Sequence, residues 1–239
     1  MEHAAAGVGS GRIRARRHRG RKILHSKTRR HPARLEAAHL PQHRQAQHLH
    51  AGDRERRHVL KAEANASASG LTRDLTALKL DIREYPILKW RWKIANLIKN
   101  ADIATKEGDD YPARIYVTFR YDPERAGVGM RMQYGMAKSL YGEYPPHAGI
   151  NYVWDGKAPV GTMVPNAYTA RAMMFVVESG AKRVGEWVEV ERNVYEDYKR
   201  AFKEEPPPVL GIAVMTDTDS TGEAATAWYG DIVLRKKSP

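Results

Sequence analysis

The residues best suited to binding chemistry form a short acidic and basic group. Asp109 and Asp110 come shortly before Arg114, and Tyr116 follows on the same predicted strand face. Carboxylates and a guanidinium can clamp sugar hydroxyls or a carboxylate through charge-assisted hydrogen bonds, with an aromatic ring stacked beside them. The alternative is that the charges pair with one another on a solvated sheet face, where each pair contributes roughly 0–1 kcal/mol.

A second cationic group lies on an earlier strand. Lys89, Arg91 and Lys93 alternate with Trp90 and Trp92, so the cations face one side and the indoles the other. If this strand neighboured the strand of Arg114, Arg91 and Arg114 would share the face opposite the core. We therefore expect Arg91 to join the ligand cluster.

Five tryptophans, each on or near a predicted strand, can serve either the core or a sugar-binding platform. We assign Trp90 and Trp92 to the core, whereas Trp154 and Trp228 lie near turns and are better platform candidates. Tyr152 shares the strand face of Trp154. The predicted ligand-binding residues are thus Arg91, Asp109, Asp110, Arg114, Tyr152 and Trp154.

An acidic, turn-forming loop follows the apolar strand that ends near Met215. Its side chains Asp217, Asp219 and Glu223 offer oxygen ligands of the kind that Ca²⁺ prefers. The spacing differs from that of an EF-hand. The sequence therefore predicts either a structural calcium site or a turn whose side chains cap their own backbone. We expect no required cofactor.

Catalysis has weaker support in the sequence. Acid–base hydrolysis needs two carboxylates in one cleft with separated pKa values, and no spacing pairs the candidates. There is no Gly-x-Ser-x-Gly, phosphate loop or His-Glu-x-x-His, and the only His after residue 58, His147, lies in a Pro-rich loop. The carboxylate candidates are Asp109, Asp110, Asp217, Asp219 and Asp231.

Composition divides the chain near residue 58. Residues 1–58 hold 15 Lys and Arg, 4 Asp and Glu, 9 of the 10 His and no aromatic residue, whereas residues 59–239 have a net charge of +1 and all 20 aromatics. A nearly neutral domain has no global attraction for phosphate, so nucleic acid is an unexpected partner for residues 59–239. The absence of Cys excludes disulfides and thiolate sites.

The basic segment 1–58 has three interpretations. It can be a disordered arm that binds nucleic acid or anionic lipid, a His-based metal binder, or a segment unrelated to the domain, such as an out-of-frame translation of a GC-rich gene. We favour the third. The chain shows no apolar stretch of the roughly 18–20 residues needed to span a bilayer, and its start lacks the apolar core of a signal peptide.

The remainder predicts a mainly β fold. A capping box at Asn193–Glu196 predicts a helix that ends before Pro206, and Met130, Tyr134, Ala137 and Tyr141 indicate a second, weaker one. Many strands with one or two short helices favour an antiparallel β-sandwich, most often a jelly roll. The predicted strands are 59–64, 70–75, 86–94, 113–121, 150–154, 171–178, 187–191, 209–216 and 226–234.

Several stretches in a fixed order resemble one bacterial family of uncharacterised proteins, domain-of-unknown-function family 3047. The resemblance covers about residues 59–234 and implies a galactose-binding-like sandwich, a shape shared with carbohydrate-binding modules. Family members usually carry an export signal, which implies a periplasmic or secreted location. The stretches are Tyr85–Lys93, Lys106–Val117, Ile150–Trp154, Val164–Asn166, Glu205–Pro208, Gly211–Glu223 and Tyr229–Ile232.

From these observations we expect a binding domain for a carbohydrate or cell-envelope polymer that performs no catalysis. The ligand class follows from analogy of fold, which does not fix function. Two alternatives remain, a polysaccharide hydrolase that uses the clustered Asp residues and a protein interaction module. The sequence does not define an oligomeric state.

Overall fold

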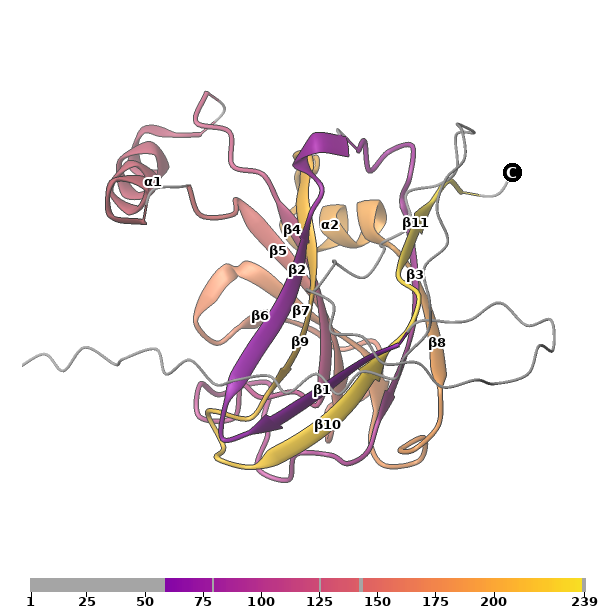
Figure 1. Ribbon diagram of the computed structural model, residues 1–239. Helices are drawn as coiled ribbons and strands as arrows, with labels where there is room; N and C mark the ends of the chain where they lie inside the picture. The colour runs from indigo at the N-terminus through magenta and orange to yellow at the C-terminus, as the bar shows by residue number, and fades with distance from the viewer. Residues whose placement is uncertain (1–58, 79, 125, 142–143, 238–239) are drawn as a thin grey trace, which may run out of the picture.

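The computed structural model consists of two β-sheets packed face to face, with two α-helices at one end (Figure 1). It describes residues 59–237 apart from 79, 125 and 142–143. The basic segment 1–58, and every prediction made for it, lies outside the described residues. Among the described residues the fold is a mainly β sandwich, as the sequence predicted.

The first sheet, sheet A, has five strands arranged around β3. One edge of β3 pairs with β8, and the other pairs first with β10 and then with β11. The edge strand β1 pairs with β10. All pairs in this sheet are antiparallel. The strands are β1 (Leu60–Asn65), β3 (Ile87–Ile94), β8 (Val188–Asn193), β10 (Ala224–Tyr229) and β11 (Val233–Arg235).

The second sheet, sheet B, has six strands in the order β2-β9-β4-β5-β7-β6. The pair β5–β7 is parallel and the other pairs are antiparallel, so the sandwich is largely rather than wholly antiparallel. The strands are β2 (Ala68–Asp74), β4 (Ala113–Phe119), β5 (Ala148–Asp155), β6 (Met163–Asn166), β7 (Thr169–Ser179) and β9 (Val209–Asp217).

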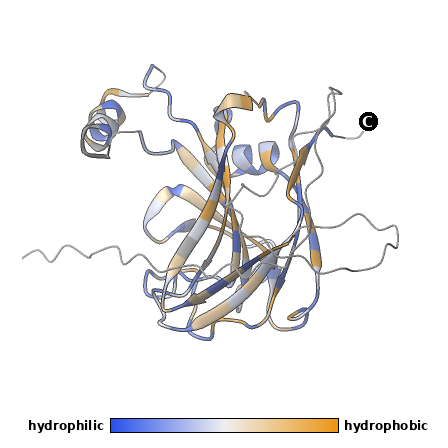
Figure 2. Ribbon diagram, in the orientation of Figure 1, coloured by the Kyte–Doolittle hydropathy of each residue, from blue (hydrophilic) through white to orange (hydrophobic). Residues whose placement is uncertain are grey.

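Strict alternation along the strands builds the core between the sheets. On β3, Trp90 and Trp92 point inward and are buried, and their rings meet edge to face with centroids 5.5 Å apart. On β4, Ile115 and Val117 come from the opposite sheet into the same core. Figure 2 shows the resulting alternation of hydrophobic and hydrophilic residues along the strands. The predicted core role of both tryptophans is confirmed.

The predicted strands are present, with two differences. The predicted strand 226–234 is two strands, β10 and β11, interrupted at Gly230–Ile232. The short strand β6 was not predicted, since Pro165 within it argues against a strand. Pro165 is tolerated because β6 lies at the edge of sheet B, where only one side of the strand is paired.

Both predicted helices are present. Helix α2 (Val194–Phe202) begins as expected, with the side chain of Asn193 accepting a hydrogen bond from the backbone N–H of Glu196 at 3.1 Å. It ends at Lys203 in a left-handed conformation. Its buried face, with Val194 and Tyr198, packs on the core. A single turn of 3₁₀ helix covers Thr76–Leu78.

Helix α1 (Val128–Tyr141) projects away from the sandwich (Figure 1). Tyr134 packs against the ring of Tyr121, which lies just after β4 (Ala113–Phe119), with centroids 4.4 Å apart. Val128, Met132 and Met136, spaced four residues apart, form an exposed apolar stripe on the helix. Within the described residues, no helix is both long and apolar enough to cross a membrane.

Candidate functional site

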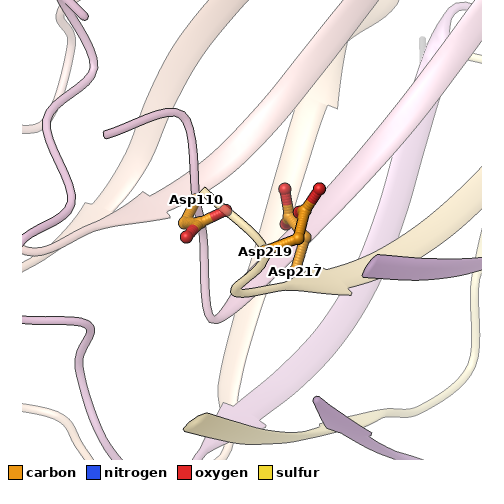
Figure 3. A group of neighbouring side chains, drawn as sticks. All are labelled: Asp110, Asp217 and Asp219. Carbon is orange, nitrogen blue, oxygen red and sulfur yellow. The ribbon is translucent and has the colours of Figure 1, made fainter. Parts of the chain in front are cut away.

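Four aspartates and one arginine meet at one end of sheet B. We call Asp109, Asp110, Asp217 and Asp219, together with Arg114, the aspartate cluster. Antiparallel pairing places the start of β4 beside the end of β9, and Arg114 lies opposite Met215 in that register. The two acidic segments, far apart in the sequence, therefore converge at the same end of the sheet (Figure 3).

Arg114 is the centre of the cluster. Its guanidinium donates to Asp217 and lies 3.9 Å from a carboxylate oxygen of Asp109. The rings of Tyr111 and Tyr116 lie 5.0 and 5.1 Å from the guanidinium carbon. With 4% of its surface exposed, Arg114 is enclosed by these neighbours, so a ligand has little access to it.

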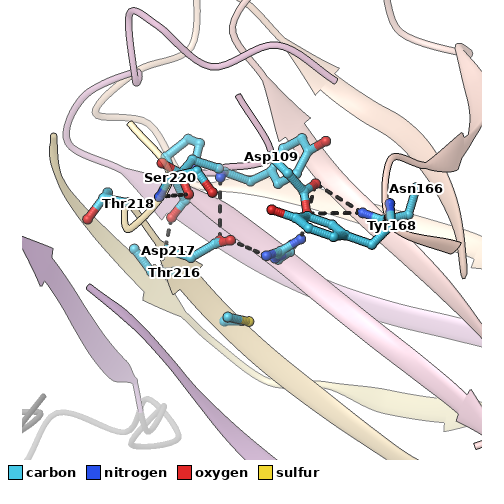
Figure 4. A network of polar contacts seen from close by, with 12 residues as sticks. Asp109, Asn166, Tyr168, Thr216, Asp217, Thr218 and Ser220 are labelled. Carbon is cyan, nitrogen blue, oxygen red and sulfur yellow. Dashed lines mark hydrogen bonds and ion pairs between the residues drawn. The ribbon is translucent and has the colours of Figure 1, made fainter. Parts of the chain in front are cut away.

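The buried carboxylates of Asp109 and Asp110 accept hydrogen bonds from other parts of the protein rather than facing solvent. Asp109 accepts from the side-chain amide of Asn166 at 3.0 and 3.1 Å. Asp110 accepts from the backbone N–H groups of Ser220 and Thr221 at 3.2 and 2.7 Å. These bonds tie three separate loops together (Figure 4). The cluster thus fixes the end of the sheet.

Burial strongly affects the acid chemistry of Asp217. Burial raises the pKa of its carboxyl to about 7 even though Arg114 pulls it down, and the negative charges of Asp110 and Asp109 add to the rise. The Asp217 carboxylate also accepts a hydrogen bond from the backbone N–H of Tyr111 at 3.4 Å. Four carboxylates around one guanidinium leave an excess of negative charge, which favours the protonated form of Asp217.

Three members of the cluster could hold a hard cation. One carboxylate oxygen from each of Asp110, Asp217 and Asp219 lies within 4.8 Å of the others. Oxygen ligands suit Ca²⁺, and Asp217 and Asp219 were both predicted as metal ligands.

Glu223, the third predicted ligand, lies apart from this group. Its carboxylate accepts from the backbone N–H groups of Lys99 and Asn100 at 3.0 and 2.8 Å, and these bonds hold its pKa below the usual range.

The structure separates Arg91 from the other predicted ligand residues. Arg91 lies on β3 in sheet A and Arg114 on β4 in sheet B. Each points away from the core, but from opposite sides of the sandwich. The predicted shared face is therefore wrong, because strands that follow each other in the chain here belong to different sheets.

Tyr152 and Trp154 lie inside the core rather than on a platform. Trp154 contacts Trp92 with ring centroids 6.2 Å apart, and Tyr152 contacts Trp90 at 5.2 Å. Both are fully buried, and the Tyr152 hydroxyl donates to Asp197 at 2.8 Å. Strand β5 is covered on both faces, so every residue in it is buried.

A different surface carries half-buried aromatic and basic groups. Lys61 on β1, Trp228 on β10 and Lys93 on β3 are cross-strand neighbours on the outer face of sheet A, and Trp187 lies just before β8. We call these four residues together with Arg91 the cation–aromatic row. The ammonium groups of Lys61 and Lys93 lie 5.9 and 4.4 Å from the Trp228 ring centroid, and Lys93 is 5.5 Å from the Trp187 ring centroid.

Arg91 completes this row because a glycine makes space for it. Its guanidinium carbon lies 4.4 Å from the Trp187 ring centroid. A Cβ on Gly230 would come within 2.4 Å of the Arg91 Nε and 2.6 Å of its Cγ. Gly230 therefore permits the arginine stem to cross the gap between β10 and β11. The backbone N–H of Gly230 also donates to the carbonyl of Arg91 at 2.8 Å.

Only part of the row could have been found from the sequence. The alternation that puts Trp90 and Trp92 inward also puts Arg91 and Lys93 outward, and Trp228 was a predicted platform residue. Lys61 and Trp187 join through strand pairing, for which the sequence carries no local signal. The row thus depends on four separate segments that only the sheet brings together.

Comparison with protein families relates the chain to a family with no assigned function. A family model described as "Protein of unknown function (DUF3047)" matches residues 33–233. The match begins 26 residues before Val59, the position at which the resemblance was expected to begin, and so includes part of the basic segment. No curated protein matches the chain.

Proposed function

Because the chain belongs to the DUF3047 family, whose description assigns no function, we propose one from its surface chemistry: the domain binds a carbohydrate or cell-envelope polymer, without catalysis, on the outer face of sheet A. The observation that carries the proposal is the cation–aromatic row. Indole rings provide apolar contact area and an N–H donor, and the cations between them provide charge-assisted hydrogen bonds. A sugar chain offers C–H surfaces and oxygen acceptors to both.

The geometry of the row favours an extended ligand. The row crosses β1, β10 and β3 and reaches the start of β8, so its side chains lie along a line across the sheet. These four neighbouring strands, from β1 to β8, span three strand spacings, about 14–15 Å. A surface of this length suits a polymer segment of several sugars better than a single small molecule.

The face of sheet A is poorly equipped for hydrolysis. Its outward carboxylates are all paired with cations of the same face: Glu63 with Lys61 at 2.6 Å, Glu189 with Lys89 at 2.9 Å, and Glu191 with Arg235. The aspartate cluster supports the hydrolase alternative less well, because a catalytic carboxyl must reach the substrate. Asp110 and Asp217 have 0% and 1% of their surface exposed.

Binding of purified polysaccharides, measured by titration calorimetry with product release followed in parallel, tests the proposal. We expect binding without release of sugar ends, and loss of most of the affinity in Trp228→Ala. Tyr168→Ala is the matched control, because Tyr168 is an exposed aromatic beside the other sheet, with Lys106 over its ring. The variants should keep the circular dichroism of the wild type.

Three outcomes would overturn the proposal. Affinity that is lost in Tyr168→Ala but kept in Trp228→Ala would move the site to the neighbourhood of the aspartate cluster. Release of sugar ends that stops in Asp219→Asn would support the hydrolase instead. Absence of binding to every neutral and acidic polymer in the panel would also reject it.

A further inference from the structure

The cation–aromatic row has an arrangement that selects for charge as well as for sugar surface. The Trp228 ring has the ammonium groups of Lys61 and Lys93 within 5.9 and 4.4 Å of its centroid, on the neighbouring strands β1 and β3. Aromatic and cationic side chains therefore alternate along the row. An incoming polymer meets an ammonium or guanidinium group beside each indole.

We propose that the ligand of this face is an acidic polysaccharide, with carboxylates on its sugars that reach Arg91 and Lys93. This inference rests on the proposed function and adds the chemical class of the ligand. The feature that the site recognises is a negative charge carried by a sugar chain. Uronate polymers have this charge and neutral glycans do not.

The charge balance of the face supports an anionic ligand. Among the described residues that point outward from the strands of sheet A, five are basic and three are acidic. The acidic ones are engaged locally, since Glu63 pairs with Lys61 at 2.6 Å, Glu189 with Lys89 and Glu191 with Arg235. The excess positive charge thus falls on Arg91 and Lys93, whose side chains lie against the indoles.

Spacing lets one carboxylate approach both cations. Arg91 and Lys93 lie two residues apart on the same face of β3, with about 6.5–7 Å between their Cα atoms. The rings of Trp187 and Trp228 both lie beside Lys93. The sugars next to the charged one can therefore stack on an indole.

The indole positions hold the cations in place before binding. A cation over an aromatic face is stabilised by about 0.5–1 kcal/mol at an exposed site. Lys93 lies within 5.5 Å of two ring centroids, and Arg91 is confined by the backbone at Gly230. The side-chain entropy lost on binding is therefore smaller than for unconstrained surface cations.

The experiment compares hyaluronate, which has one carboxylate per disaccharide, with its carboxyl-reduced form, using the full chain and calorimetry at several salt concentrations. We expect hyaluronate to bind about tenfold more tightly than the reduced polymer, and its affinity to fall with salt. Lys93→Gln should weaken hyaluronate binding by about three- to tenfold and reduce the salt dependence. Lys106→Gln, a cation over Tyr168 beside the other sheet, is the control and should bind as the wild type does.

The outcomes separate this inference from the proposed function. Equal affinity for both polymers would reject an acidic ligand while keeping carbohydrate binding on sheet A. Absence of binding to either polymer, and to neutral glycans, would reject both. Equally tight binding of inorganic polyphosphate would show a general affinity for polyanions and overturn the polysaccharide assignment. Self-association that Trp228→Ala abolishes would assign the face to a second copy of the chain.

Discussion

Asp217 shows how a single residue can link the candidate site to stability. Its carboxylate is almost fully buried beside Arg114 and shares its surroundings with Asp109 and Asp110. Removal from water disfavours the charged form more than one guanidinium can offset. The residue is therefore a source of pH dependence as well as a contact that holds the loops.

The raised pKa of Asp217 predicts that the protein loses stability as pH rises from about 4 to 7. In that window the folded state keeps a proton, since the pKa is raised to about 7, whereas the unfolded chain has released it near the ordinary value of 3.8. Between pH 5 and 8 the free energy of unfolding should fall by roughly 2–3 kcal/mol from this group. Asp217→Asn should remove that part of the slope in urea denaturation with a chelator present.

Asp219→Asn serves as the control for this measurement, because Asp219 lies on the exposed rim of the same cluster. It should keep the wild-type dependence on pH. A slope that is unchanged in Asp217→Asn would show that other groups cause it.

Calcium binding at Asp110, Asp217 and Asp219 is a second prediction at this scale. Millimolar Ca²⁺ should raise the melting temperature by about 2–4 °C for each kcal/mol of binding free energy, because the ion binds the folded state. Differential scanning calorimetry with and without chelator measures this. The shift should vanish in Asp219→Asn and persist in Glu223→Gln, since Glu223 is engaged with the backbone N–H groups of Lys99 and Asn100. A shift that Glu223→Gln abolishes would contradict the structural grouping.

At the scale of the elements, helix α2 shows how local sequence signals act. Asn193 closes β8 and opens the helix, with its side chain bonded to the N–H of Glu196. Glu196 and Asp197 lie in the first turn, where negative charge interacts favourably with the helix dipole. All of these signals lie within five residues, so the sequence alone was sufficient to place the start of the helix.

The cap predicts a measurable loss of stability. Asn193→Ala should lower the free energy of unfolding by about 1 kcal/mol, because it leaves a backbone donor at the helix start without its partner. Asn193→Asp, which keeps an acceptor oxygen, should stay close to the wild type. Urea denaturation followed by circular dichroism makes the comparison. Equal stability of Asn193→Ala and the wild type would mean that the cap contributes nothing here.

At the scale of the whole molecule, the described core is formed by residues from Leu60 onward. The family match, by contrast, begins at residue 33. The domain boundary near residue 58 was inferred from composition, and the structure describes the chain only from residue 59. The boundary therefore remains a prediction. It can be tested by comparing a fragment that begins at residue 59 with one that begins at residue 33.

The composition boundary predicts that a fragment of residues 59–239 folds with the same cooperative unfolding and melting temperature as the full chain. The sheets and core that the structure describes are formed by residues from position 59 onward. Thermal unfolding of fragments 59–239 and 33–239 compares the two starting points. Lower stability of 59–239 that is restored in 33–239 would place residues 33–58 within the folded unit.

The sequence by itself determined most of the strands, the helix cap and the inward faces of β3 and β4, but it missed β6 and the interruption between β10 and β11. These features follow from local periodicity, because successive side chains on a strand must point to opposite sides. It also placed Arg91 and Lys93 outward, and it selected Asp109, Asp110 and Arg114, which the fold brings together.

Only the tertiary structure decided which strands pair and which sheet each joins. Local alternation carries no information on pairing, so it could not separate Arg91 from Arg114, bury Trp154, or join Asp110 to Asp217. The same applies to the cation–aromatic row, which needs β1, β3 and β10 side by side. Pairing depends on how the whole chain buries its apolar surface, and that free energy belongs to no single segment.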